Sequence, residues 1–73
     1  MTTQEYVALR KEVYGNPAAL HIISLSDKNI MINFKAHLDE DDKKEREKNR
    51  RILKHYRDNY PDLWNKIERL LKA

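Results

Sequence analysis

Residues 20–36, LHIISLSDKNIMINFKA, decide the fold class of this chain of 73 residues. Two apolar, partly β-branched runs, at 20–25 and 30–36, flank the polar segment 26–29. Runs of this kind around a four-residue polar turn are typical of a β-hairpin. In the second run the apolar residues alternate with polar or flexible ones, which gives a strand one apolar face. The apolar positions are Ile30, Ile32, Phe34 and Ala36. The sequence therefore predicts a β-hairpin over residues 20–36.

The segment before the hairpin predicts a helix over residues 3–14. Thr2 and Glu5 have the spacing of a capping box, and the residues Gly-Asn-Pro at 15–17 stop the run. Between these signals, apolar residues recur at helical spacing, at Tyr6, Leu9 and Val13.

The segment after the hairpin opens with DEDDKKEREKNRR at 39–51, in which twelve of thirteen residues are charged. The acids come first and the bases follow, which is the order that the dipole of an exposed helix favours. We expect a helix from about residue 39 to about residue 59, with a solvated first half that overhangs the core. Apolar residues return only at Ile52, Leu53 and Tyr56. Pro61 then suits the first turn of a last helix, which runs to about residue 72. Its apolar stripe is Leu63, Trp64, Ile67, Leu70 and Leu71.

These elements predict a small single α+β domain over residues 1–73, in the order helix, β-hairpin, long charged helix, short amphipathic helix. A two-stranded sheet is marginally stable alone, so the helices must cover its apolar face. The chain has no cysteine, which excludes disulfides and thiolate metal sites. It has neither a signal-peptide pattern nor an apolar run of about 20 residues, so we expect a soluble, cytoplasmic protein with no membrane contact.

Catalytic and metal-binding patterns are missing. The histidines are His21, His37 and His55, and no nucleophile–base pair or metal-spaced ligand set accompanies them. His21 and His37 lie near the open end of the predicted hairpin and could approach each other, but surface strand residues are the preferred interpretation. The acids at 39–42 are interpreted as helix-capping residues rather than as a cation site. We therefore expect no enzyme, no cofactor, no metal and no small-molecule substrate.

The strongest charge pattern is basic. From residue 43 onward, eleven bases face five acids, a net charge of +6. On a helix, five of these bases fall within about 80° of one another, on the side away from the apolar residues at 52–56. We name these five residues the basic stripe: Lys43, Arg46, Arg50, Lys54 and Arg57. The stripe spans about 21 Å, enough to follow several phosphates of a nucleic acid. An acidic protein surface and plain solvent are the alternatives, and a helix-turn-helix is disfavoured because the connection at 58–61 has no glycine.

A second candidate surface is the other face of the predicted hairpin. There Ile22 and Met31 stay exposed if the helices pack on one side only, and the edge strands offer unpaired backbone groups to a peptide. The predicted partner-binding residues are Ile22, Met31, Asn33 and Lys35. The alternatives are that the first helix covers this face or that two apolar residues are simply exposed.

A small, cysteine-free chain with a short helix, a hairpin and a highly charged helix resembles small bacteriophage-encoded regulators of host RNA polymerase. The resemblance covers the whole length in size and construction. It implies a non-enzymatic protein that binds RNA polymerase subunits in the host cytoplasm and modulates transcription. Direct nucleic-acid binding through the basic stripe is the alternative function. The oligomeric state is open, and self-association through the last helix is one way to complete a small core.

Overall fold

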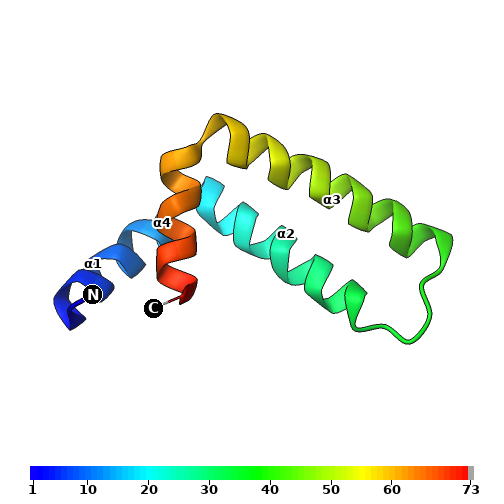
Figure 1. Ribbon diagram of the computed structural model, residues 1–73, viewed down its shortest axis with the longest axis horizontal. Helices are drawn as coiled ribbons and strands as arrows, with labels where there is room; N and C mark the ends of the chain where they lie inside the picture. The colour runs from blue at the N-terminus through cyan, green and yellow to red at the C-terminus, as the bar shows by residue number, and fades with distance from the viewer. Residues whose placement is uncertain (73) are drawn as a thin grey trace.

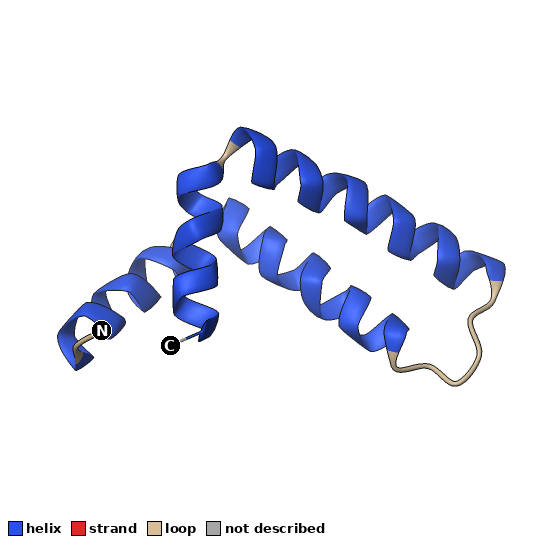
Figure 2. Ribbon diagram, viewed as in Figure 1, coloured by secondary structure: helices blue, strands red, loops and turns tan. Residues whose placement is uncertain are grey.

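The chain folds into four helices in the computed structural model, which describes residues 1–72 (Figure 1). The helices are α1 (Thr3–Tyr14), α2 (Pro17–Asn33), α3 (Glu40–Asn59) and α4 (Pro61–Lys72). No strand occurs within residues 1–72 (Figure 2). The predicted α+β class and the predicted hairpin are therefore wrong, and the described chain is all-helical.

The segment predicted as a hairpin is part of α2. This helix begins at Asn16, whose side-chain Oδ1 accepts hydrogen bonds from the backbone N–H groups of Ala18 (2.9 Å) and Ala19 (3.4 Å). Pro17 occupies the first helical position, where its fixed φ fits and its missing N–H costs nothing. The predicted turn at 26–29 lies in the middle of the helix. A strong helix start upstream thus extends through a segment whose local pattern resembles two strands.

Helices α2 and α3 run antiparallel, side by side, and the loop of residues 34–39 joins them at one end of the molecule (Figure 1). Helix α4 crosses the other end of this pair and packs against α1. The molecule is elongated, with extents of 44 × 26 × 16 Å. The main core lies at the end where α1, α2 and α4 meet. It consists of Leu9, Val13, Ala19, Ile22, Ile67 and Leu70.

The other three predicted helices are confirmed. Thr2 caps α1, because its Oγ1 accepts a hydrogen bond of 3.1 Å from the N–H of Glu5. Asp39 caps α3 in the same way, through a bond of 2.7 Å from the N–H of Asp42. At the end of α1, a Cβ atom added to Gly15 would lie only 2.9 Å from the carbonyl oxygen of Lys11. The single glycine of the chain therefore stands where the backbone approaches too closely for a side chain.

The first half of α3 does not overhang the core as expected. Asp42 and Asn49 are buried, although they lie in the highly charged half of the helix, because α2 packs along this half. The overhang was expected because this half of the helix is highly charged and carries no apolar residue before Ile52. A second long helix supplies the missing partner.

Candidate protein-docking surface

Helix α2 is apolar on two opposite sides. One side is buried against α1, α3 and α4, and its largest members are Ile22, Leu25 and Ile32. On the other side, five apolar residues fall within about 100° of one another at helical spacing. We name them the α2 outer face: Leu20, Ile23, Ile30, Met31 and Phe34. Phe34 belongs to this face because, as the C-cap residue, it keeps helical backbone angles (φ −85°, ψ −7°).

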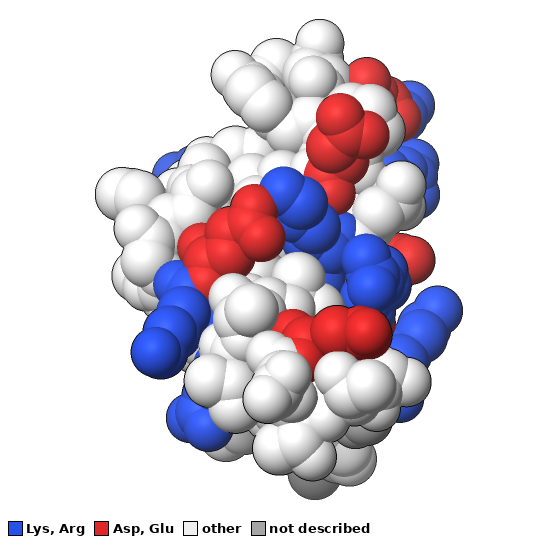
Figure 3. Space-filling model, turned by 90° about the vertical axis from the view of Figure 1, so that its left-hand side faces the viewer, with Lys and Arg blue, Asp and Glu red and all other residues white. Residues whose placement is uncertain are grey.

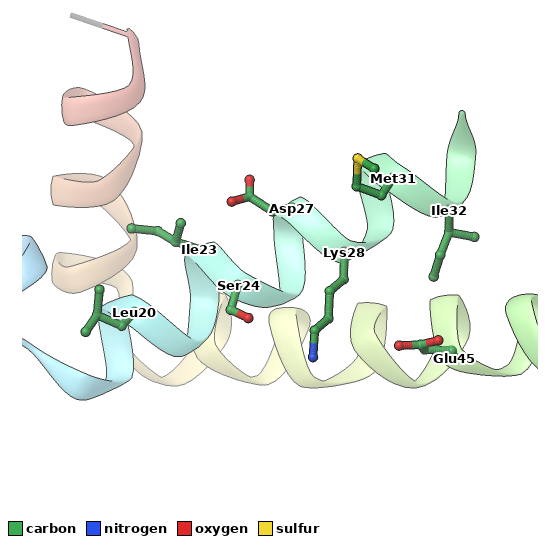
Figure 4. A pocket seen from close by; sticks show the side chains of 8 residues that line it. All are labelled: Leu20, Ile23, Ser24, Asp27, Lys28, Met31, Ile32 and Glu45. Atoms are coloured by element: carbon green, nitrogen blue, oxygen red, sulfur yellow. The ribbon is translucent and has the colours of Figure 1, made fainter. Parts of the chain in front are cut away.

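The α2 outer face is strongly exposed. The exposed fractions are 43% for Leu20, 51% for Ile30, 69% for Met31 and 82% for Phe34, whereas Ile23 is half-buried. A surface hollow of about 530 Å³ runs along this side of α2 and continues to Glu45 of α3. Figure 4 shows Leu20 and Ile23 at the end near α4, and Met31 near the other end. The chain therefore presents an apolar surface about 21 Å long, from residue 20 to residue 34.

Charged residues interrupt the face at its middle. Asp27 and Lys28 are both exposed and both line the hollow. In Figure 4, Asp27 points to the same side as Met31, whereas Lys28 points toward α3. The face thus carries one acid and one base between two apolar halves.

Polar side chains join the buried side of α2 to α3. The Nδ2 group of Asn49 donates to Oδ1 of Asn29 over 3.0 Å, and Nδ2 of Asn29 donates to the backbone carbonyl of Arg46 over 3.2 Å. Arg46 in turn donates from Nη1 to Oδ1 of Asn33 over 3.1 Å. No side-chain nitrogen or oxygen atom buried within residues 1–72 lacks a partner. This polar layer fixes how the two helices are aligned.

A charged pair closes the loop end of the α2–α3 pair. Lys35 Nζ lies 2.6 Å from Oδ1 of Asp42, whose side chain is only 12% exposed. The hydrogen bond from Lys35 holds the pKa of the Asp42 carboxyl below its usual value, and the same bond raises the pKa of the Lys35 ammonium. The pair therefore ties the loop to the first turns of α3.

The four predicted partner-binding residues do not share a surface. Ile22 is only 2% exposed and belongs to the core, so its assignment to a docking face is wrong. Asn33 and Lys35 are exposed residues, but their polar groups contact α3. Met31 is the one member that lies on the exposed apolar surface. Side chains repeat every 2 residues on a strand and every 3.6 residues on a helix, so residues that a strand would place on one face lie on different sides of a helix.

The basic stripe lies along one helix, as predicted, but its members differ in their surroundings. Arg50 and Lys54 are exposed, whereas Arg46 is half-buried and bound to Asn33. Lys43 lies 3.5 Å from Glu40 and Arg57 lies 3.7 Å from Asp58, both as exposed pairs. The stripe flanks the contact with α2 instead of pointing directly away from it.

At the end of the molecule formed by α1 and α4, the charges are mixed. Acidic and basic side chains lie next to one another there (Figure 3), and Lys66 of α4 pairs with Glu12 of α1. This end offers no extended field of one sign to a nucleic acid, which leaves α3 as the basic surface.

The histidines are far from forming a common site. His21 Nδ1 lies 2.8 Å from the hydroxyl oxygen of Tyr56, and His55 contacts Asn59. His37 lies in the loop beyond the far end of α2 from His21, so these two residues do not approach each other. Within residues 1–72, no group of three or more histidine or acidic side chains is placed to hold a metal ion. Nor does any helix in this range have the length and apolarity needed to cross a membrane.

Comparison with known proteins yields no relative: no protein family, no curated protein and no solved structure matches this chain.

Sequence reasoning missed Leu20, Ile23, Ile30 and Phe34 as surface residues. The signal was present as the spacing 20, 23, 30 and 34, which puts them on one side of a helix, and as the Asn-Pro helix start at 16–17. A second set at 22, 25, 29 and 32 has the same periodicity. Because the two helical sets together place apolar residues at most positions of this segment, neither helical period stands out in the sequence.

Proposed function

We propose that this chain is a non-enzymatic protein-binding module that docks through the α2 outer face. The observation that carries the proposal is the exposure of four large apolar residues on one side of a single helix. A helix that is apolar on two opposite sides normally has both sides covered. Here α1, α3 and α4 cover one side, and on the other side only Ile23 packs partly against the core. The remaining residues of that side have the spacing with which helices enter the grooves of partner proteins.

The size of the exposed surface supports the same function. If a fully exposed large apolar residue offers about 200 Å², these four residues present about 500 Å² together. That is near the upper end of the largest apolar patches on monomeric proteins, and such patches commonly mark interaction sites. The free-energy cost of exposing these four side chains to water is removed when a partner covers them.

The resemblance to phage regulators suggests a partner and a role. We propose bacterial RNA polymerase as the first partner to test, with modulation of transcription in the host cytoplasm as the consequence. The hairpin was one of the three elements on which that resemblance rested, and it is absent from residues 1–72. The short first helix and the charged helix remain.

The test is capture of purified bacterial RNA polymerase by the immobilised chain. Met31→Glu places a carboxylate among the most exposed apolar residues of the proposed contact, and we expect it to lower capture at least tenfold. Asn65→Glu makes the same charge change at an exposed position of α4 and should leave capture unchanged. Equal capture by the wild type and both variants would exclude this face as the polymerase-binding surface.

Nucleic-acid binding through α3 is a second candidate, because eight bases face two acids between residues 43 and 57. Phosphate contacts give an affinity that falls steeply with salt. We expect Arg50→Ala and Lys54→Ala each to reduce the slope of log K against log salt by about 0.9. Absence of binding to duplex and single-stranded DNA or RNA at about 50 mM salt would rule this candidate out.

A further inference from the structure

We infer that the α2 outer face binds a second copy of this chain, with the two α2 helices antiparallel about a two-fold axis near residues 27 and 28. The inference rests on the proposed docking function of this face and names its occupant. A two-fold contact requires a surface that is complementary to itself. The α2 outer face meets this requirement in its spacing, its surroundings and its area.

The apolar residues are placed symmetrically about position 27. Leu20 and Phe34 lie seven residues to either side of Asp27, and Ile23 and Met31 lie four residues to either side. An antiparallel pair therefore brings the Leu20 end of one helix against the Phe34 end of the other. The aliphatic side chain of Leu20 in each copy then faces the larger aromatic side chain of Phe34 in its neighbour, which favours interdigitation.

The centre of the contact is charged in either arrangement. Asp27 and Lys28 are adjacent and exposed, and both line the hollow. With the two-fold axis at position 27, Asp27 of each copy faces Asp27 of the other, and Lys28, which points toward α3, is the neighbouring opposite charge. A parallel pair also places Asp27 of the two copies at the same level, so the direction is set by the apolar spacing and not by these charges.

Helix α4 restricts the direction further. It stands across the N-terminal end of α2 and extends to the side on which Ile23, Asp27 and Met31 point (Figure 4). The recess is therefore bounded at that end, whereas the side of the α2–α3 loop is open (Figure 1). Two antiparallel copies place their α4 helices at opposite ends of the contact. Two parallel copies would bring both α4 helices to the same end, where they compete for space.

The area agrees with a dimer contact. An interface of standard size buries about 800 Å² on each partner. The exposed apolar residues of the α2 outer face supply about 500 Å² of this by the estimate above, close to the apolar share of about 65% that homodimer interfaces have. Two α2–α3 pairs joined in this way form a layer of four helices with α2 and its copy in the middle.

The first test is sedimentation equilibrium of the full chain between about 1 μM and 1 mM, a range that brackets weak and moderate association. We expect the mass to rise toward twice that of one chain. Phe34→Glu should raise the dimer dissociation constant at least about 30-fold, the effect of losing a hot-spot side chain, whereas Asn65→Glu should leave it unchanged. Far-UV circular dichroism checks that both variants keep their helices. A wild type that stays monomeric up to 1 mM overturns the inference.

The second test fixes the direction, and the absence of native cysteine makes it simple. Leu20→Cys and Phe34→Cys chains are mixed and treated with a short bismaleimide cross-linker. Antiparallel helices predict a mixed Leu20→Cys/Phe34→Cys product and little product from either variant alone. Strong cross-linking of each variant with itself would overturn the antiparallel arrangement.

The two proposals fail separately. If the chain remains monomeric but Met31→Glu still abolishes polymerase capture, the second copy is wrong as the occupant and the docking function stands. If self-association is observed and Phe34→Glu removes it, the occupant is identified without any other protein.

Discussion

Replacing Ile22 with alanine distinguishes the observed helix from the hairpin that the local sequence pattern predicts. In a hairpin, Ile22 and Met31 belong to the same exposed face and should respond alike to truncation. In the structure they lie on opposite sides of α2, with exposed fractions of 2% and 69%. The two alanine variants should therefore differ strongly in their free energy of unfolding.

The size of the effect follows from the burial of Ile22. Truncation to alanine removes three carbon groups at about 0.8 kcal/mol each, or about 2.4 kcal/mol of transfer free energy. The cavity left among the core residues adds to this, and the better helix propensity of alanine offsets about 0.4 kcal/mol. We expect a loss of about 3 kcal/mol, a large part of the roughly 4–11 kcal/mol available to a domain of this length. The corresponding fall in Tm is about 12–24 °C.

Urea unfolding followed by far-UV circular dichroism measures the loss. The protein concentration should be near 1 μM, so that self-association contributes little to the apparent stability. Met31→Ala is the matched control on the same helix, and it should change the free energy of unfolding by less than about 0.5 kcal/mol. Small and equal effects of the two substitutions, with unchanged m-values, would refute the placement of Ile22 in the core.

Three further substitutions test the polar contacts and the end of α1. Asn49→Ala leaves Oδ1 of the buried Asn29 without its hydrogen-bond donor. The free energy of unfolding, measured by urea titration, should therefore fall by about 1–3 kcal/mol, and a loss below about 0.5 kcal/mol would contradict a buried hydrogen bond. Because Lys35 lowers the pKa of Asp42, the unfolded chain binds a proton more readily than the folded chain, and the stability from this pair is lost as the pH falls from about 5 toward 2. Melting curves should show a weaker acid dependence in Asp42→Asn, and an identical dependence would count against the pair. Gly15→Ala should lower the Tm, because the added Cβ meets the backbone of α1, and an unchanged or higher Tm would show that the close approach relaxes freely.

Three of the four helices could be predicted from local signals. The caps at Thr2 and Asp39, the stop at Gly15 and the proline at position 61 mark their ends. The first three act through hydrogen bonds within a few residues, and the proline acts through its fixed φ. These contacts need no tertiary structure. The bounds of these helices therefore agree closely with the prediction.

The hairpin prediction failed because residues 20–36 satisfy two periods at once. Alternation at 30, 32, 34 and 36 is a strand pattern, whereas the sets at 20, 23, 30, 34 and at 22, 25, 29, 32 are helical. The segment at 26–29 has turn-forming residues, yet Asn29 is the residue that accepts from Asn49 of α3. Its polar group is satisfied across the helix pair, which no local pattern reveals.

The candidate surface was predicted in part. Met31 was identified correctly as exposed, although on the wrong element, while Ile30 and Phe34 were assigned to the covered face of a sheet and Leu20 to neither face. Exposure depends on which side of α2 faces α3 and α4. That choice is made by packing, so a sequence with apolar residues on both sides cannot specify it.

The sequence alone determined where three of the four helices begin and end, because capping groups, proline and glycine act on neighbouring backbone atoms. It also determined the basic character of α3, since charge counts need no coordinates. Only the tertiary structure decided that residues 17–33 form one helix, because burial of Ile22 and pairing of Asn29 with Asn49 require α1, α3 and α4. The same packing decided which apolar residues remain exposed, and so created the α2 outer face.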